Sequence, residues 1–120
     1  MKILIVDDDP DMRFLVSKLV AQRSSFEVIG QASNGAEAIH RVADLSFHFV
    51  IMDINMPVMD GVEATRHIRD KFPAVVVLAF TAGTMEQVDE MLAAGASGYV
   101  MKQNMSNELS YYLGAMPKSA

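Results

Sequence analysis

The chain has 120 residues, the common length of one domain, and we expect a single domain over residues 1–120 with its own core. Because 51% of its residues are hydrophobic and 21% are charged, the composition excludes a disordered chain. It has no cysteine and a formal net charge of −5, which excludes disulfides and thiolate chemistry and argues against direct contact with nucleic acid.

No segment is apolar enough to span a membrane. The apolar runs fall well short of the roughly 20 residues that a bilayer requires. The residues after Met1-Lys2 form a short strand-like run and not a signal peptide. We therefore expect a cytoplasmic protein with no membrane partner.

Short apolar runs alternate along the chain with longer segments whose apolar residues recur at helical spacing. The runs predict five strands, at Lys2–Val6, Phe26–Gln31, His48–Met52, Ala74–Phe80 and Ser97–Met101. The first, third and fourth are apolar throughout their centres, which is typical of parallel strands that are buried on both faces.

The first helix is predicted by Asp9-Pro10-Asp11, which supplies an N-cap, a proline at the first helical position and an acid in the first turn. We interpret Asp9 as this cap and not as a third acid of a metal site. The apolar face of the helix is expected to consist of Met12, Leu15, Val16 and Leu19.

Capping signals also mark the later helices. Three pairs resemble capping boxes, in which two side chains satisfy free amide donors reciprocally: Asn34 with Glu37, Asp60 with Glu63, and Thr84 with Gln87. Gly95 suits the left-handed position after the fourth helix, whose inward face includes Leu92. The fifth helix is expected to begin near Asn104 or Ser106 and to stop before Pro117.

Five alternating strands and helices predict an α/β fold, a doubly wound five-stranded parallel sheet with helices on both faces. In such sheets, ligands bind beyond the carboxyl ends of the strands. The polar residues at these ends are Asp7, Asp8, Asp53, Thr81 and Lys102. Together, three acids, a hydroxyl and an ammonium suit a hard cation and a phosphoryl group, although each residue alone is a weak signal.

Carboxylates this close repel one another, so we expect raised carboxyl pKa values that a divalent cation would relieve. Mg²⁺ fits best because it prefers oxygen ligands and combines carboxylates with phosphate oxygens. A softer metal is disfavoured, since the three histidines lie outside this rim: His40, His48 and His67. With the cation bound, Asp53 would attack a phosphoryl group in line while Lys102 neutralises its oxygens, giving a labile aspartyl phosphate.

Four stretches resemble the motifs of response-regulator receiver domains of two-component systems. They are ILIVDD at 3–8, MDINMPVMDG at 52–61, FTA at 80–82 and GYVMK at 98–102, and the similarity covers nearly the whole chain. The resemblance implies a flavodoxin-like (βα)5 fold with strand order 2-1-3-4-5. That order places the first and third strands side by side, so that Asp8 and Asp53 become neighbours.

The resemblance also implies a function. A single receiver domain would accept a phosphoryl group from a sensor histidine kinase or a phosphotransfer protein, with Mg²⁺ as cofactor. It would not be an enzyme beyond its own phosphorylation and dephosphorylation. The face formed by the fourth helix, fifth strand and fifth helix would then change to control an output domain or partner. The expected output is transcriptional regulation, and phosphorylation is expected to produce a homodimer. DNA would be contacted only through a separate output domain.

Residue roles follow from the same resemblance. Asp53 is the phosphoacceptor, and Thr81 and Lys102 contact the phosphoryl oxygens. Tyr99 matches an aromatic switch that turns inward when Thr81 moves toward the phosphoryl group. The implied metal ligands are Asp8 directly, Asp7 through water, Asp53, and the main-chain carbonyl of Asn55.

Two positions depart from the family pattern. Gln103 follows Lys102 where receivers often carry proline, so we expect a trans peptide bond and a different loop. Gly83 lies two residues after Thr81, at a position that in the family influences phosphoryl lifetime, and the lifetime stays open. The missing proline and the short helix near residues 61–69 are similar to receivers joined to helix-turn-helix domains. Whether the chain is a stand-alone regulator or part of a longer one also stays open.

Two other functions remain as alternatives. Asp7 and Asp9 have the spacing of the two acids in phosphohydrolases of the haloacid-dehalogenase type, but Pro10 and Asp11 depart from the usual continuation. We also find no segment for the cap domain with which such enzymes enclose a small substrate. The second alternative is a receiver-like interaction domain that no longer uses phosphate, against which the intact set of acids argues.

Overall fold

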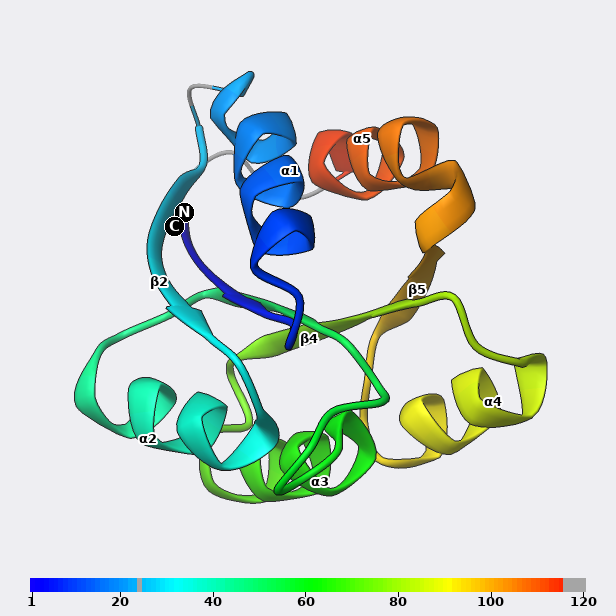
Figure 1. The fold of residues 1–120 in the computed structure, drawn as a ribbon. Coiled ribbons are helices and arrows are strands. Elements are labelled where there is room, and N and C mark those ends of the chain that lie inside the picture. Colours follow the sequence, from blue (N-terminus) through cyan, green and yellow to red (C-terminus); the bar gives the residue numbers. More distant parts are fainter. Residues whose placement is uncertain (24, 116–120) are drawn as a thin grey trace.

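The computed structural model describes residues 1–23 and 25–115. Five parallel strands form one sheet in the order β2-β1-β3-β4-β5, as predicted (Figure 1). The strands are β1 (Lys2–Val6), β2 (Glu27–Ala32), β3 (Phe49–Met52), β4 (Val76–Thr81) and β5 (Gly98–Met101). The α/β, doubly wound, flavodoxin-like fold is thereby confirmed.

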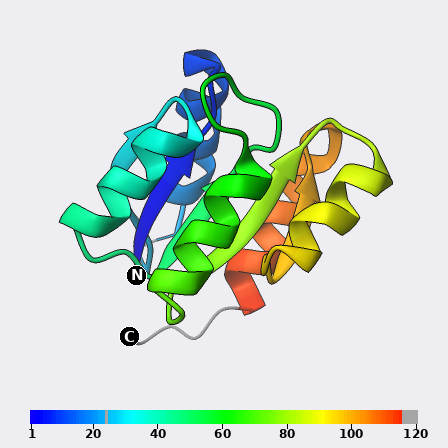
Figure 2. The same ribbon diagram turned by 90° about the horizontal axis from the view of Figure 1, so that it is seen from below.

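Helices cover both faces of the sheet. α1 (Pro10–Ala21) and α5 (Met105–Ala115) lie on one face, while α2 (Gly35–Asp44), α3 (Gly61–Lys71) and α4 (Met85–Ala93) lie on the other (Figures 1 and 2). A short 3₁₀ helix, η1 (Lys102–Asn104), joins β5 to α5. The predicted end of the last helix before Pro117 lies outside the described residues. None of the helices in the described part of the chain combines the length and apolar character that a membrane span requires.

Each face of the sheet has its own core cluster, because successive side chains of a strand point to opposite faces. In β1, Ile3 and Ile5 belong to the cluster under α1 and α5, whereas Leu4 and Val6 belong to the cluster over α2, α3 and α4. All four residues of β3 are fully buried, as expected for a central parallel strand. The strands that lead to the acids and to Thr81 are thus buried over most of their length, whereas the edge strand β5, which leads to Lys102, is only half buried.

Four predicted N-caps hold their helices. The side chains of Asp9, Asn34, Asp60 and Thr84 each accept a hydrogen bond from a backbone N–H of the first turn. Within the described residues, however, the reciprocal bond of a full capping box forms only between Thr84 and Gln87. The predicted boxes of α2 and α3 are half-formed; in α2, Glu37 instead accepts a hydrogen bond from the Ser33 hydroxyl.

Gly95 also lies as predicted. Its φ is +115°, and the N–H groups of Gly95 and Ala96 donate to the carbonyls of Leu92 and Met91 at 3.1 and 3.0 Å. These two bonds form a Schellman motif that ends α4. A side chain at this position would also collide with Arg69, whose Cγ lies 2.7 Å from the place of a Cβ.

Other details differ from the prediction, among them the starts of β2, β3 and β5, each one residue later than predicted. Leu15 and Leu92 were expected on buried faces, but they are 46% and 39% exposed. In α1 the buried residues are Val16 and Val20, one turn apart, so Leu15 falls about 100° away at the edge of that face. Strand β4 starts at Val76 and not at Ala74, because a turn closed by Val75 N–H on the Phe72 carbonyl precedes it.

The loop after β3 folds back on its own start. The N–H of Gly61 donates to the carbonyl of Ile54 at 2.8 Å, and a Cβ on Gly61 would lie 2.0 Å from the carbonyl oxygen of Asp53. In the same loop, Val58 is the one non-glycine residue of the described chain with positive φ, at 70°. A hydrogen bond of 2.7 Å from Met59 N–H to the Pro57 carbonyl closes a γ-turn around it.

This close approach predicts the effect of a single methyl group. Gly61→Ala forces a Cβ into a main-chain oxygen, so we expect the free energy of unfolding to fall by about 1–3 kcal/mol. Urea denaturation followed by circular dichroism measures the change. The matched control is Gly114→Ala in α5, where the nearest atom would lie at 3.7 Å and the helix should gain about 0.5–1 kcal/mol. Equal effects of the two substitutions would contradict this account of the loop.

Candidate functional site

The carboxyl ends of β1, β3, β4 and β5 surround a pocket of about 370 Å³. Every residue predicted to form the site lines this pocket except Tyr99. The lining of the pocket consists of Asp7, Asp8, Asp9, Asp53, Asn55, Thr81, Ala82, Gly83 and Lys102. A larger pocket, of about 500 Å³, lies between the end of α1 and the start of β2, but it contains no group of acids.

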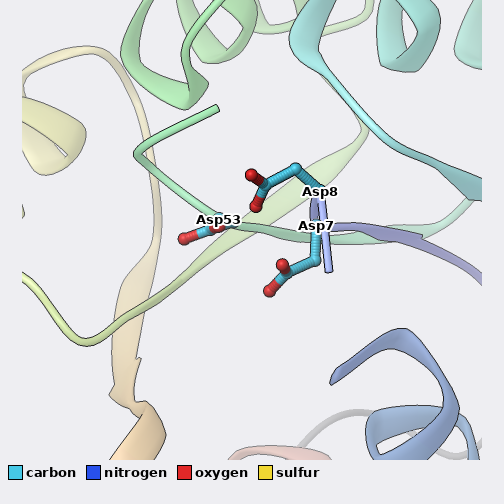
Figure 3. Close-up of side chains that lie close together, drawn as sticks. All are labelled: Asp7, Asp8 and Asp53. Atoms are coloured by element: carbon cyan, nitrogen blue, oxygen red, sulfur yellow. The ribbon is translucent and has the colours of Figure 1, made fainter. Parts of the chain in front are cut away.

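Strand order brings the acids together. β1 and β3 are neighbours in register, with Val6 opposite Met52, and the N–H of Asp53 donates to the Val6 carbonyl at 2.9 Å. Asp7 and Asp53 are therefore adjacent and buried, while Asp8 is exposed. Each of the three acids offers a carboxylate oxygen within 4.8 Å of the others (Figure 3).

Lys102 reaches this cluster from β5, across the intervening strand β4. Its Nζ lies 2.8 Å from Asp7 Oδ2 and 3.4 Å from Asp53 Oδ2. The ammonium also lies 5.4 Å from the centre of the Phe80 ring, close enough for a cation–π contact. One ammonium thus contacts two of the three carboxylates.

The hydrogen bonds of the two buried acids leave one oxygen short of donors. Asp7 Oδ1 accepts from Asp9 N–H at 2.9 Å, and Asp53 Oδ1 accepts from Ile54 N–H at 2.8 Å. Asp7 Oδ2 is buried, and the described chain offers it no partner other than the Lys102 ammonium at 2.8 Å. The Lys102 ammonium is thus the group that compensates this oxygen in the described chain.

Burial and neighbouring charges shift the pKa of two groups. Burial, followed by the negative charge of Asp7, raises the pKa of Asp53 from 3.8 to about 6, although Lys102 and the Ile54 N–H oppose the change. Burial lowers the pKa of Lys102, but the contact with Asp7 and the charge of Asp53 outweigh it and leave the pKa raised. The prediction of a raised carboxyl pKa is confirmed for Asp53.

The acid cluster fits a metal ion on the chemistry of its donors. The three acids offer only oxygen ligands, and one of these oxygens, Asp7 Oδ2, is buried with the Lys102 ammonium as its one partner in the described chain. The expected ligand Asn55 lines the same pocket. Buried carboxylates of this kind are normally paired or bound to a hard cation. Residues Asp7, Asp8 and Asp53 are thus able to hold a metal.

Asp9 also lines the pocket, but its carboxylate serves the helix. Its Oδ1 accepts a hydrogen bond from Asp11 N–H at 2.9 Å, as expected of an N-cap. This confirms the interpretation of Asp9 as a cap. It also weakens the phosphohydrolase alternative, in which Asp9 would be the second acid of the chemistry.

The predicted switch residues lie on neighbouring strands. Thr81 is fully buried at the end of β4, and its Oγ1 accepts a hydrogen bond from Gly83 N–H at 2.8 Å. Tyr99 of β5 is partly buried and packs against the core cluster over α2, α3 and α4. Its partner in register is Ala79, two residues before Thr81, so Tyr99 lies beside the site and not in the pocket lining.

Sequence reasoning missed two side chains that shape this rim. Arg13, in α1, donates to the main-chain carbonyl of Asp7 at 2.7 Å and to the Gln31 side chain at 3.0 Å. Gln87, in the first turn of α4, pairs with the side chain of Asn55. Nothing in the sequence separates Arg13 from a solvated arginine, and Gln87 was identified only as a capping residue.

The loop after Lys102 has the expected trans geometry. The described residues contain no cis peptide bond, and Gln103 lies in η1. In addition, the Glu108 side chain accepts a hydrogen bond from Met101 N–H at 3.1 Å. The backbone that carries Lys102 is thus tied to α5.

Comparison with known proteins identifies the family. Residues 3–113 match the response regulator receiver domain family. A protein-glutamate methylesterase/protein-glutamine glutaminase of Nocardioides sp. is 41% identical over 105 residues, which are 85% of this chain and 29% of that protein. Response regulator protein VraR of Staphylococcus aureus is 33% identical over 111 residues, 92% of this chain and 53% of that protein. The chain thus spans about half, or less, of the length of these relatives.

Solved structures agree with this assignment. A two-component response regulator of the LuxR family from Aurantimonas sp. SI85-9A1 is 34% identical, with a TM-score of 0.89 over 95% of this chain and 82% of that one. The isolated REC domain of RcsB from Salmonella enterica serovar Typhimurium is 26% identical, with a TM-score of 0.88 over 96% and 86%. From its matched residues, its strand order and its acid cluster, the chain belongs to the response regulator receiver domain family.

Proposed function

We propose that this domain accepts a phosphoryl group on Asp53 from a sensor histidine kinase or a phosphotransfer protein, with Mg²⁺ as cofactor. The observation that carries the proposal is the buried Asp53 carboxylate, which lies beside Asp7 and Asp8 and 3.4 Å from the Lys102 ammonium. A carboxylate becomes a useful nucleophile toward phosphorus when nearby cations neutralise the incoming oxygens.

The metal ligands in this proposal are Asp8 directly, Asp7 through water, Asp53, and the main-chain carbonyl of Asn55. Their oxygens are the hard donors that Mg²⁺ prefers, and the buried Asp7 Oδ2 supports the need for a second cation beside Lys102. When bound, Mg²⁺ supplies positive charge to the phosphoryl oxygens.

Lys102 and Thr81 hold the phosphoryl oxygens in this proposal. Lys102 already contacts Asp53 and has only to exchange Asp7 for a phosphoryl oxygen. The Thr81 hydroxyl accepts from Gly83 N–H, which leaves its own proton free to donate. Once Thr81 turns toward the phosphoryl group, space opens beside it on β4, and Tyr99 on the neighbouring strand turns inward.

The face formed by α4, β5 and α5 carries the output in this proposal, through an output domain or through homodimer formation. Relatives support a transcriptional output, since one solved relative is the RcsB–DNA complex and another is a LuxR-family regulator. DNA is contacted through a separate output domain. The domain itself acts in the cytoplasm and has no enzymatic activity beyond its own phosphorylation and dephosphorylation, although one relative is a methylesterase.

Phosphoryl uptake tests the proposal directly. We expect acetyl phosphate with Mg²⁺ to label the domain at one site, measured by intact-protein mass and by phosphate-affinity gels. Asp53→Ala should abolish labelling because it removes the acceptor carboxylate. Asp9→Asn is the matched control, because asparagine keeps the N-cap and removes a negative charge from the same pocket. Labelling of Asp53→Ala, or none of the parent, would refute the proposal.

The raised pKa of Asp53 predicts a pH dependence. Below about pH 6 the metal-free carboxyl is protonated, so Mg²⁺ must displace a proton to bind. We expect the apparent Mg²⁺ affinity to be constant above pH 6 and to fall about tenfold per pH unit below it. Carbon-13 NMR of the Asp53 carboxyl should titrate near pH 6 without metal and at lower pH with Mg²⁺. A metal-free midpoint near 3.8 would contradict the raised pKa.

If the face formed by α4, β5 and α5 carries the output, a phosphoryl analogue should change the affinity of the homodimer. With beryllofluoride and Mg²⁺, we expect the dimer to tighten by about tenfold, a common size for such coupling, as measured by sedimentation velocity. Thr81→Ala should retain phosphoryl uptake at Asp53 but lose most of this tightening, because the hydroxyl that would move is absent. A dimer that is equally tight with and without beryllofluoride would exclude this form of output.

A further inference from the structure

The side chain of Asn55, which lines the pocket, is paired with the side chain of Gln87. Gln87 Nε2 donates to Asn55 Oδ1 at 3.0 Å, and Asn55 Nδ2 donates to Gln87 Oε1 at 3.4 Å. The first residue lies two positions after Asp53, and the second lies in the first turn of α4, 32 residues away in sequence. The pair therefore joins the loop after β3 to the start of α4.

The absence of a side chain at Gly83 makes room for this pair. A Cβ on Gly83 would lie 2.0 Å from Gln87 Oε1, so the glutamine occupies the space that a side chain at position 83 would take. Asn55 and Gly83 both line the pocket. A third hydrogen bond, from Thr84 N–H to Gln87 Oε1 at 3.2 Å, fixes the glutamine from the helix side.

We propose that Gln87 is a positioning residue that closes this side of the pocket through Asn55 and thereby slows hydrolysis of the aspartyl phosphate. This inference rests on the proposed phosphorylation of Asp53. In hydrolysis, the oxygen of a water forms a bond to phosphorus, the bond between phosphorus and the Asp53 oxygen breaks, and the carboxylate leaves with its electron pair. The proton of the water passes to solvent.

The pair opposes this reaction in two ways. It spans the gap between the two loops, where water would otherwise enter beside Gly83. It also holds the Asn55 carboxamide in one orientation, with one of its two N–H groups and one lone pair of its oxygen already used, so that fewer groups remain to orient a water toward phosphorus. Without Gln87, the Asn55 carboxamide is free at the rim of the pocket.

The test is the decay of phosphorylated protein after the donor is removed, with Mg²⁺ in excess. We expect Gln87→Ala to speed the first-order decay about three- to tenfold, the size that corresponds to one or two ordinary hydrogen bonds. Because Gln87 acts through Asn55, Gln87→Ala should change the decay by less than about twofold in an Asn55→Ala background. This loss of effect distinguishes positioning from a general weakening of α4.

Thr84→Ala is the matched control for the helix cap. It removes the 3.3 Å bond from Gln87 N–H to the Thr84 hydroxyl but leaves both side chains of the pair, so the decay should stay within about twofold of the parent. The inference is overturned if Gln87→Ala decays at the parent rate or more slowly. It is equally overturned if Thr84→Ala accelerates decay as much as Gln87→Ala does. Additive effects of Gln87→Ala and Asn55→Ala on the decay rate would overturn it as well. A parent that takes up no phosphoryl group would instead refute the proposed function, and this inference with it.

Discussion

The contact of one ammonium with two buried carboxylates is the interaction on which the site depends. Lys102 lies 2.8 Å from Asp7 and 3.4 Å from Asp53, while Asp8 adds a third negative charge nearby. Burial, followed by the negative charge of Asp7, keeps the folded-state pKa of Asp53 above its ordinary 3.8. In the metal-free domain, the stability that Asp53 contributes is therefore fully present below the ordinary pKa of 3.8 and is lost as the pH rises through about 6. The acid cluster is able to hold a cation, which would change this balance.

The fold holds these charges in place through its backbone. Neighbouring strands in register place Asp7 beside Asp53, and packing of Gly61 on the Asp53 carbonyl fixes the loop that follows. Arg13 holds the carbonyl of Asp7 from α1. Since charged groups repel, a flexible rim would let them separate into water. Packed strands and main-chain hydrogen bonds prevent that separation, so the electrostatic strain persists until a ligand relieves it.

The sequence predicted the strands, the helix caps and the acids of the rim, because these depend on local periodicity and on strand ends. Strand order came from the family resemblance. Features that depend on several loops at once were not predictable. The pairing of Asn55 with Gln87 requires both the fold of the β3–α3 loop and the lack of a side chain at Gly83. Similarly, Leu15 has the right residue type for a core, and only the rotation of α1 against the sheet exposes it.

No proline follows Lys102, and a hydrogen bond to α5 constrains the backbone there instead. β5 is an edge strand, so the N–H of Met101 has no further strand with which to pair. Glu108 of α5 accepts that hydrogen bond, and η1 continues directly from Lys102 into α5. The position of Lys102 is thus fixed by α5 and not by a proline ring. Because α5 also belongs to the proposed output face, these contacts connect Lys102 directly to that face. This connection is separate from the proposed path through Thr81 and Tyr99.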